Sequence, residues 1–125
     1  MLPGGGAGTT AACRSRPLGL LSGEVKDWQL AASSVVSRAV DADCAVKYAR
    51  LHAPGKRAWC PENLKQGEWI LVDLGVQSEV SGVMTQGRDT MDQWVTQFYI
   101  SYSEDAYRWA HCVQKSILVP VHTVP

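Results

Sequence analysis

The sequence lacks an excess of charge of either sign and lacks any long hydrophobic run. Its 125 residues carry 12 Lys and Arg and 12 Asp and Glu, which gives a formal net charge of zero. Proteins that bind nucleic acids usually present a basic patch to the phosphates, so this composition argues against a nucleic-acid partner. The longest apolar runs, such as residues 117–121 (ILVPV), fall far short of the ~20 residues of a membrane-spanning helix. The opening segment MLPGGGAGTTAA has neither the basic start nor the apolar block of a signal peptide.

Motifs of catalysis and of metal binding are missing as well. The chain contains no GxSxG, HExxH, P-loop or dinucleotide-binding glycine pattern. Its three histidines are scattered along the chain, and its four cysteines form no CxxC pair. The sequence therefore predicts a protein that is not an enzyme and that holds neither a metal ion nor a cofactor.

The cysteines favour disulfide bonds. Cys13, Cys44, Cys60 and Cys112 allow three different pairings, and the residues by themselves leave the choice open. Disulfides are characteristic of secreted proteins, whereas this chain shows no export signal. We therefore expect a fragment or an isoform of a protein that is extracellular or displayed at the cell surface.

Alternation of apolar and polar residues predicts several short β-strands. The clearest span residues 69–74, 79–86 and 95–103, another begins at 107–110, and a first strand is expected at 29–34. Turn signals such as SEDA at residues 103–106 separate them. Short strands with turn signals about every dozen residues are typical of an all-β sandwich or barrel.

The remaining segments complete this expectation. We interpret Trp59, Trp69 and Trp109 as core residues, because each indole can bury ~200 Å² of surface. Residues 1–12 are rich in Gly, Ala and Thr and are predicted to be a disordered leader. The tail after residue 112 is β-branched but contains Pro120, so it could serve only as an edge segment.

Six blocks of sequence carry a family resemblance. They are CRSRPLGLLSGEVKDWQLAASS, YARL, AW, EWILVDLG, VSGVMTQGR and WVTQFYISYSEDAYRW, and they follow one another in the order found in discoidin domains. The chain thus resembles this family, also called coagulation factor V/VIII type C domains, from Cys13 to about Trp109. The resemblance implies a distorted jelly roll of about eight antiparallel strands. Only about five strands can be found, so we expect a domain at residues 13–112 that lacks its last strands, followed by a divergent tail at 113–125.

The same resemblance implies an extracellular binding module. Ligands known in the wider family include collagen, phosphatidylserine membranes, galactose-type sugars and protein receptors. The segments AWC, TQGRD and WVTQF look most like the discoidin domains of carboxypeptidase-like matrix proteins and of collagen-receptor kinases. This favours an extracellular protein ligand such as collagen in cell adhesion or matrix recognition. An anionic phospholipid or a glycan is the alternative ligand, and a truncated isoform without binding activity is the alternative of a different class.

Loops at one end of such a domain are expected to contact the ligand. The first, RAVDADCAVKY at residues 38–48, carries one sizeable apolar tip residue next to two carboxylates, and these would be repelled by an anionic bilayer. Residues 88–94 combine an arginine fork and carboxylates with adaptable apolar side chains, which suits an extended protein chain. The third is 61–67. The candidate ligand-binding residues are Arg38, Val40, Asp41, Tyr48, Arg88, Asp89, Met91, Asp92 and Trp94.

Several of these residues have a simpler interpretation. Arg88 could instead form a structural salt bridge under its loop, and Asp89 and Asp92 could be solvated turn residues. Trp94 fits a strand in the core as well as it fits an exposed anchor.

The resemblance also implies roles for two cysteines. Family members use the positions of Cys13 and Cys60 in disulfides whose partner cysteines lie in the strands missing here. We therefore expect Cys13 and Cys60 to be free or mispaired.

Overall fold

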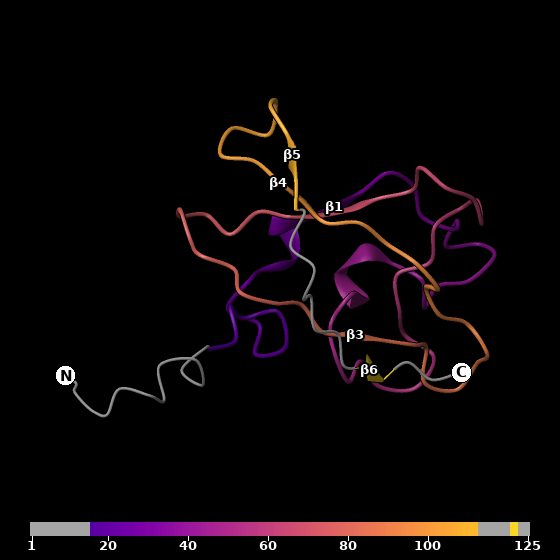
Figure 1. Cartoon of the computed structure of the whole chain (residues 1–125). Helices are drawn as coiled ribbons and strands as arrows, with labels where there is room; N and C mark the ends of the chain where they lie inside the picture. The colour runs from indigo at the N-terminus through magenta and orange to yellow at the C-terminus, as the bar shows by residue number, and fades with distance from the viewer. Residues whose placement is uncertain (1–15, 113–120, 123–125) are drawn as a thin grey trace.

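The fold is built from short strands joined by long loops. The computed structural model describes residues 16–112 and 121–122 (Figure 1). Within these residues, two single-turn 3-10 helices and six strands follow one another: η2 (Asp27–Gln29), β1 (Leu30–Ala32), η3 (Val46–Tyr48), β2 (Ile70–Val72), β3 (Thr85–Gln86), β4 (Ser101–Tyr102), β5 (Ala110–His111) and β6 (Val121–His122). No helix among the described residues is both long and apolar enough to cross a membrane.

Strands β1 and β2 form an antiparallel pair in which Leu30 lies opposite Val72. The pairing continues past both ends of the ladder. The Ser33 amide donates to the Trp69 carbonyl, and the Asp73 amide donates to the Gln29 carbonyl. These bonds connect segments about forty residues apart in sequence. They satisfy backbone groups on both sides of β1, from the end of η2 to the start of the first long loop.

The other strands form two separate pairs. Strand β3 runs parallel to β6, while β4 and β5 form an antiparallel hairpin that projects from the body of the molecule in Figure 1. The carboxylate of Asp105 closes the hairpin turn by accepting bonds from the amides of Tyr107 and Arg108. Because these bonds satisfy amides at the tip of an exposed turn, the hairpin holds its shape with few contacts to the body.

The all-β class predicted from the sequence is confirmed, but the strands are shorter than predicted. Of residues 79–86, only Thr85–Gln86 is a strand, and of residues 95–103 only Ser101–Tyr102 is. The strand expected at 107–110 begins only at Ala110. An alternating pattern makes a segment suitable for a sheet, but ladder hydrogen bonds also require a neighbouring strand. Strand β6 lies in the tail and pairs with β3 alone among the described residues, as expected of an edge segment.

Few side chains are buried. Val25, Leu30 and Cys44 are the buried apolar residues in the part of the chain that the structure describes. The prediction that all three tryptophans lie in a core is wrong for two of them, because Trp69 and Trp109 are about half exposed. Trp109 lies on the projecting hairpin and Trp69 precedes a strand with a single neighbour, so neither side chain is covered. Trp59 is half-buried, and its indole Nε1 donates to the Ser34 carbonyl at 2.9 Å.

Candidate ligand-binding end

Three loops come together on the right-hand side of Figure 1 and are called here the loop end: residues 37–48, 54–67 and 86–94. The first two run alongside each other. The Ala58 amide donates to the Asp43 carbonyl at 3.0 Å, and the Cys60 amide donates to the Cys44 carbonyl at 3.2 Å. A disulfide joins Cys44 and Cys60, whose Cα atoms are 4.9 Å apart. This part of the chain is therefore held both by backbone bonds and by a covalent link.

Cys60 is not free, because it is bonded to Cys44, which is not the partner that the resemblance implies. The resemblance placed its partner in distant strands, whereas residues 45–59 fold back and bring Cys44 of the neighbouring loop beside it. Cys13 lies outside the described residues. Cys112, at the end of β5, is a half-buried free cysteine.

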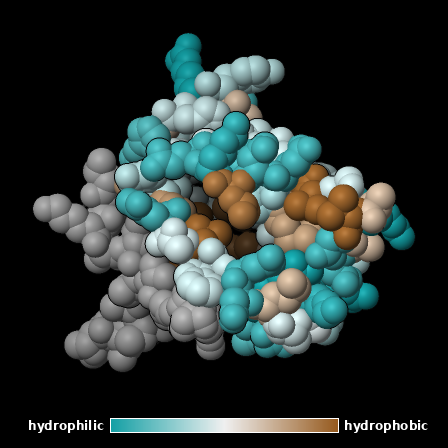
Figure 2. All heavy atoms as spheres, turned by 90° about the vertical axis from the view of Figure 1, so that its right-hand side faces the viewer, coloured by the Kyte–Doolittle hydropathy of each residue, from teal (hydrophilic) through white to brown (hydrophobic). Residues whose placement is uncertain are grey.

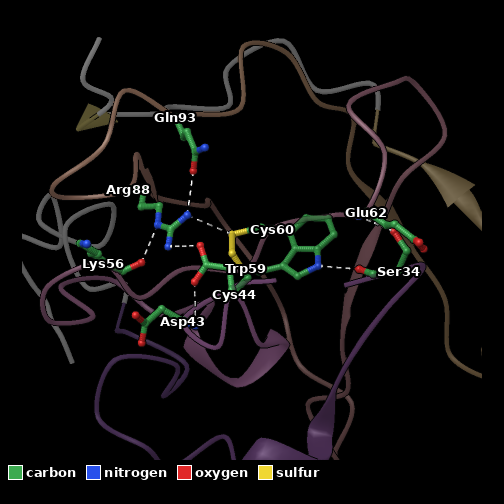
Figure 3. The surroundings of a disulfide bond; sticks show 10 residues. Ser34, Asp43, Cys44, Lys56, Trp59, Cys60, Glu62, Arg88 and Gln93 are labelled. Carbon is green, nitrogen blue, oxygen red and sulfur yellow. Dashed lines mark hydrogen bonds and ion pairs between the residues drawn. A yellow bond between two sulfur atoms is a disulfide. The ribbon is translucent and has the colours of Figure 1, made fainter. Parts of the chain in front are cut away.

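Arg88 joins the third loop to the other two (Figure 3). Its side chain is only 3 % exposed. The guanidinium donates to the Asp41 carboxylate at 2.9 Å, to the Gln93 side-chain oxygen at 2.9 Å and to the Lys56 carbonyl. One of its nitrogens, Nη1, also lies 3.6 Å from the Cys60 sulfur. A buried charge is tolerated only when it is paired and hydrogen-bonded, and Arg88 meets both conditions.

The electrostatics of this pair are visible at Asp41. The hydrogen bond from Arg88 holds the pKa of the Asp41 carboxyl below its usual value of 3.8, and a bond from the Asp43 amide adds to the effect. Arg88 also closes its own loop, because its amide donates to the Gln93 carbonyl at 2.9 Å. Residues 89–92 are thus presented as a tight turn on a buried base.

The predicted site residues fall into two groups: a base of buried and half-buried residues that holds the loops together, and a surface of exposed residues. Arg88 belongs to the base, as its structural-salt-bridge interpretation expects, and its partner Asp41 is half-buried. Tyr48 is also half-buried, and its ring lies 5.3 Å from the Lys47 ammonium and 5.0 Å from the Arg57 guanidinium. The exposed members are Arg38, Val40, Asp89, Met91, Asp92 and Trp94.

Sequence reasoning missed several residues that shape this end. Gln93 and the Lys56 carbonyl hold Arg88 from two sides, and no pattern in the sequence marks either of them. Leu64, at the tip of residues 61–67, is 96 % exposed. A lone leucine between polar residues was the available signal. Among the described residues, no group of His, Cys, Asp and Glu could hold a metal ion.

Comparison with known proteins assigns the chain to a family. The family model named F5/8 type C domain matches residues 29–123. The chain belongs to the discoidin family. The discoidin domain is a β-sandwich, as expected from the sequence. The matched residues extend beyond residue 112 into the tail.

Curated discoidin relatives agree with this assignment. "EGF-like repeat and discoidin I-like domain-containing protein 3" of Mus musculus is 38 % identical over 101 residues, covering 76 % of this chain and 21 % of the relative. "Coagulation factor VIII" of Canis lupus familiaris is 36 % identical over 103 residues, which are 80 % of this chain and 4 % of the relative. "Lactadherin" of Mus musculus is 34 % identical over 102 residues, 76 % of this chain and 22 % of the relative.

The chain thus spans about a fifth or less of the curated relatives it matches. A coagulation factor is among them, so the likeness is not confined to the matrix-protein and collagen-receptor domains that the sequence motifs favour. Discoidin domains of these relatives are non-catalytic binding modules of secreted or cell-surface proteins. The question that the loop end of this discoidin domain raises is what kind of ligand its side chains could contact.

Proposed function

We propose that this discoidin domain is an adhesion or matrix-recognition module whose loop end binds an extended protein ligand such as collagen. The observation that carries the proposal is a set of exposed apolar side chains on loops that the Cys44–Cys60 disulfide and Arg88 hold together. Val40 is 79 % exposed, and Met91 and Trp94 are 40 % and 43 % exposed. Figure 2 looks onto this side of the molecule, where hydrophobic atoms gather in groups around a hollow and are bordered by hydrophilic side chains.

The chemistry of this surface suits a protein chain. Trp94 and Met91 offer apolar contact that adapts to different partners, while Asp89 and Asp92 offer acceptors for amides or cationic side chains. The buried base supports recognition as well, because loops held in one conformation lose less entropy when a ligand binds. Arg88 then acts as a positioning residue under the surface, since its donors already have internal partners.

Binding to immobilised triple-helical collagen tests the proposal. We expect Met91→Ala combined with Trp94→Ala to weaken binding at least tenfold, as for central aromatic contacts in interfaces. Trp28→Ala is the matched control, because Trp28 is 78 % exposed but lies in η2, outside the loop end. Arg88→Ala should weaken binding by roughly 1–3 kcal/mol, with stability measured alongside. Unchanged binding in a folded Met91→Ala, Trp94→Ala protein would rule the loop end out.

An anionic phospholipid surface is a second candidate. It is favoured by the exposed Val40 and by the cations Lys47 and Arg57 beside the Tyr48 ring on the same end. Lysine and arginine near an anionic membrane contribute about 1 kcal/mol each. Co-sedimentation with vesicles of phosphatidylserine and phosphatidylcholine, compared with phosphatidylcholine alone, distinguishes this ligand from collagen. We expect no difference between the two vesicle types, because the carboxylates of Asp41 and Asp43 lie in the same loop directly after Val40.

The alternative of a fragment without binding activity is tested by thermal unfolding together with the two binding measurements. A cooperative thermal transition of the full chain is expected for a folded binding module. Its absence, together with failure to bind either collagen or vesicles, would favour the fragment.

A further inference from the structure

The disulfide of the loop end lies against a charged group. Arg88 Nη1 is 3.6 Å from the Cys60 sulfur, and the guanidinium is fixed there by three further bonds to Asp41, Gln93 and Lys56. An arginine stays protonated at all ordinary pH values. A thiolate formed at Cys60 would therefore meet a positive charge without any rearrangement, and a neighbouring cation is one of the features that stabilises a thiolate over a thiol.

We propose that Arg88 makes the Cys44–Cys60 disulfide a redox-responsive latch, which a dithiol reductant opens to leave a Cys60 thiolate held by the guanidinium and a loosened loop end. Exposure sets the order of events. Cys44 is buried, at 2 %, and Cys60 is half-buried, so the first thiolate of the reductant attacks the Cys60 sulfur and displaces Cys44. The second thiol of the reductant then displaces Cys60 and closes a cyclic disulfide.

The step balances with the dithiol as the only co-reactant. One S–S bond breaks in the protein and one forms in the reductant, while two electrons and two protons pass to the two cysteines. Cys60 then releases its proton to water and remains beside Arg88. In the second displacement Cys60 is the leaving group, and a stabilised thiolate leaves more readily.

The charged side chains near Cys60 decide whether a thiolate at this position is stabilised or destabilised. Asp41 opposes a second negative charge, but its carboxylate is already paired with Arg88. Lys56 is close enough to act on Asp41, and it adds positive charge on the segment that leads to Cys60. Arg57 on the same segment lies 3.9 Å from Asp43, so these two largely offset each other. The balance favours the thiolate.

The equilibrium with dithiothreitol tests the latch in the full chain. Cys13→Ser and Cys112→Ser leave one disulfide, whose oxidised fraction is measured by trapping thiols and mass spectrometry. We expect Arg88→Gln to shift this equilibrium about tenfold toward the disulfide, equivalent to about 30 mV, and Arg88→Lys to shift it less. If Arg88 were only a structural brace, its loss would destabilise the folded chain closed by the disulfide more than the loosened dithiol form, and the equilibrium would shift toward the dithiol. A shift of that sign, or none, overturns the proposal.

A second measurement does not depend on the disulfide. In Cys13→Ser, Cys44→Ser, Cys112→Ser protein, Cys60 is the sole thiol, and its alkylation rate is followed against pH. The midpoint is expected to lie below that of the same chain unfolded in guanidinium chloride, and Arg88→Gln should abolish the difference. Equal midpoints in the folded and unfolded chains would also overturn the proposal. Neither measurement needs a ligand, so their outcome is independent of the binding function proposed above.

Discussion

The loop end and the β4–β5 hairpin are stabilised in opposite ways. In the loop end, a disulfide, a part-buried ion pair and backbone bonds connect three separate loops. In the hairpin, the bonds are local, and large side chains face solvent: Tyr102 is 63 % exposed and Tyr107 is 89 % exposed. Stabilisation of these two regions depends on links between separate parts of the chain rather than on hydrophobic content, because apolar residues stabilise a region only when other atoms cover them.

The largest test of this comparison removes the covalent link. Cys44→Ser should lower the free energy of unfolding by about 3 kcal/mol, the value expected for a closed loop of this size, since the two cysteines are 16 residues apart. Urea unfolding of the oxidised chain measures it. Cys112→Ser is the control, because Cys112 is a free cysteine at the hairpin and its loss leaves the loop end intact. Equal stability of Cys44→Ser and the unaltered chain would show that the loops hold without the disulfide.

The next test compares a buried and an exposed ion pair. Arg88→Ala should cost about 1.5–3 kcal/mol, since it removes the part-buried hydrogen bonds that a charged group makes to Asp41, Lys56 and Gln93. Arg57→Ala removes a pair with Asp43 at 3.9 Å whose side chains are 47 % and 43 % exposed, so less than about 1 kcal/mol should be lost. Equal losses from both variants would mean that Arg88 does not brace the loops.

Acidification should affect the loop end and the hairpin through two different carboxylates. The pKa of Asp41 is lowered mainly by the hydrogen bond from Arg88, so this pair stabilises the fold fully above the usual value of 3.8. The contribution is lost as pH falls through the lowered pKa. Below about pH 4, NMR should therefore report coupled changes at the amides of Arg88 and Gln93.

Asp105 provides the hairpin counterpart. Its pKa is lowered mainly by bonds from the Arg108 and Tyr107 amides, so its titration should disturb only residues 103–108. Asp41→Asn should remove the response at Arg88 and leave the hairpin response unchanged. Spread of the Asp105 titration into the loop end would contradict the separation of the two regions.

The smallest effect is expected on the hairpin surface. Tyr107→Ser should change the unfolding free energy by no more than about 0.5 kcal/mol, because the side chain is almost fully exposed. Thermal unfolding of the variant checks this. A loss above 1 kcal/mol, of the kind that buried aromatics show, would mean that part of the chain covers Tyr107 in solution.

The sequence by itself determined the fold class, the family and the position of the loop end. Period-two alternation and turn signals require only local information, and they located β1 and β2 within the predicted ranges. The family blocks located the loops, and the composition of residues 88–94 marked them as unusual. The sequence also raised both interpretations of Arg88 without deciding between them.

Tertiary structure decided which segments became strands and which side chains were buried. Residues 95–100 alternate well, yet the ladder of β4 begins at Ser101, because pairing depends on a neighbour that the pattern does not supply. The same holds for the disulfide and for Arg88. The pairing of Cys60 with Cys44 and the burial of Arg88 against Asp41, 47 residues away, depend on how loops return in space. Contacts between residues that are distant in sequence leave no local signal, because each partner alone is an ordinary loop residue.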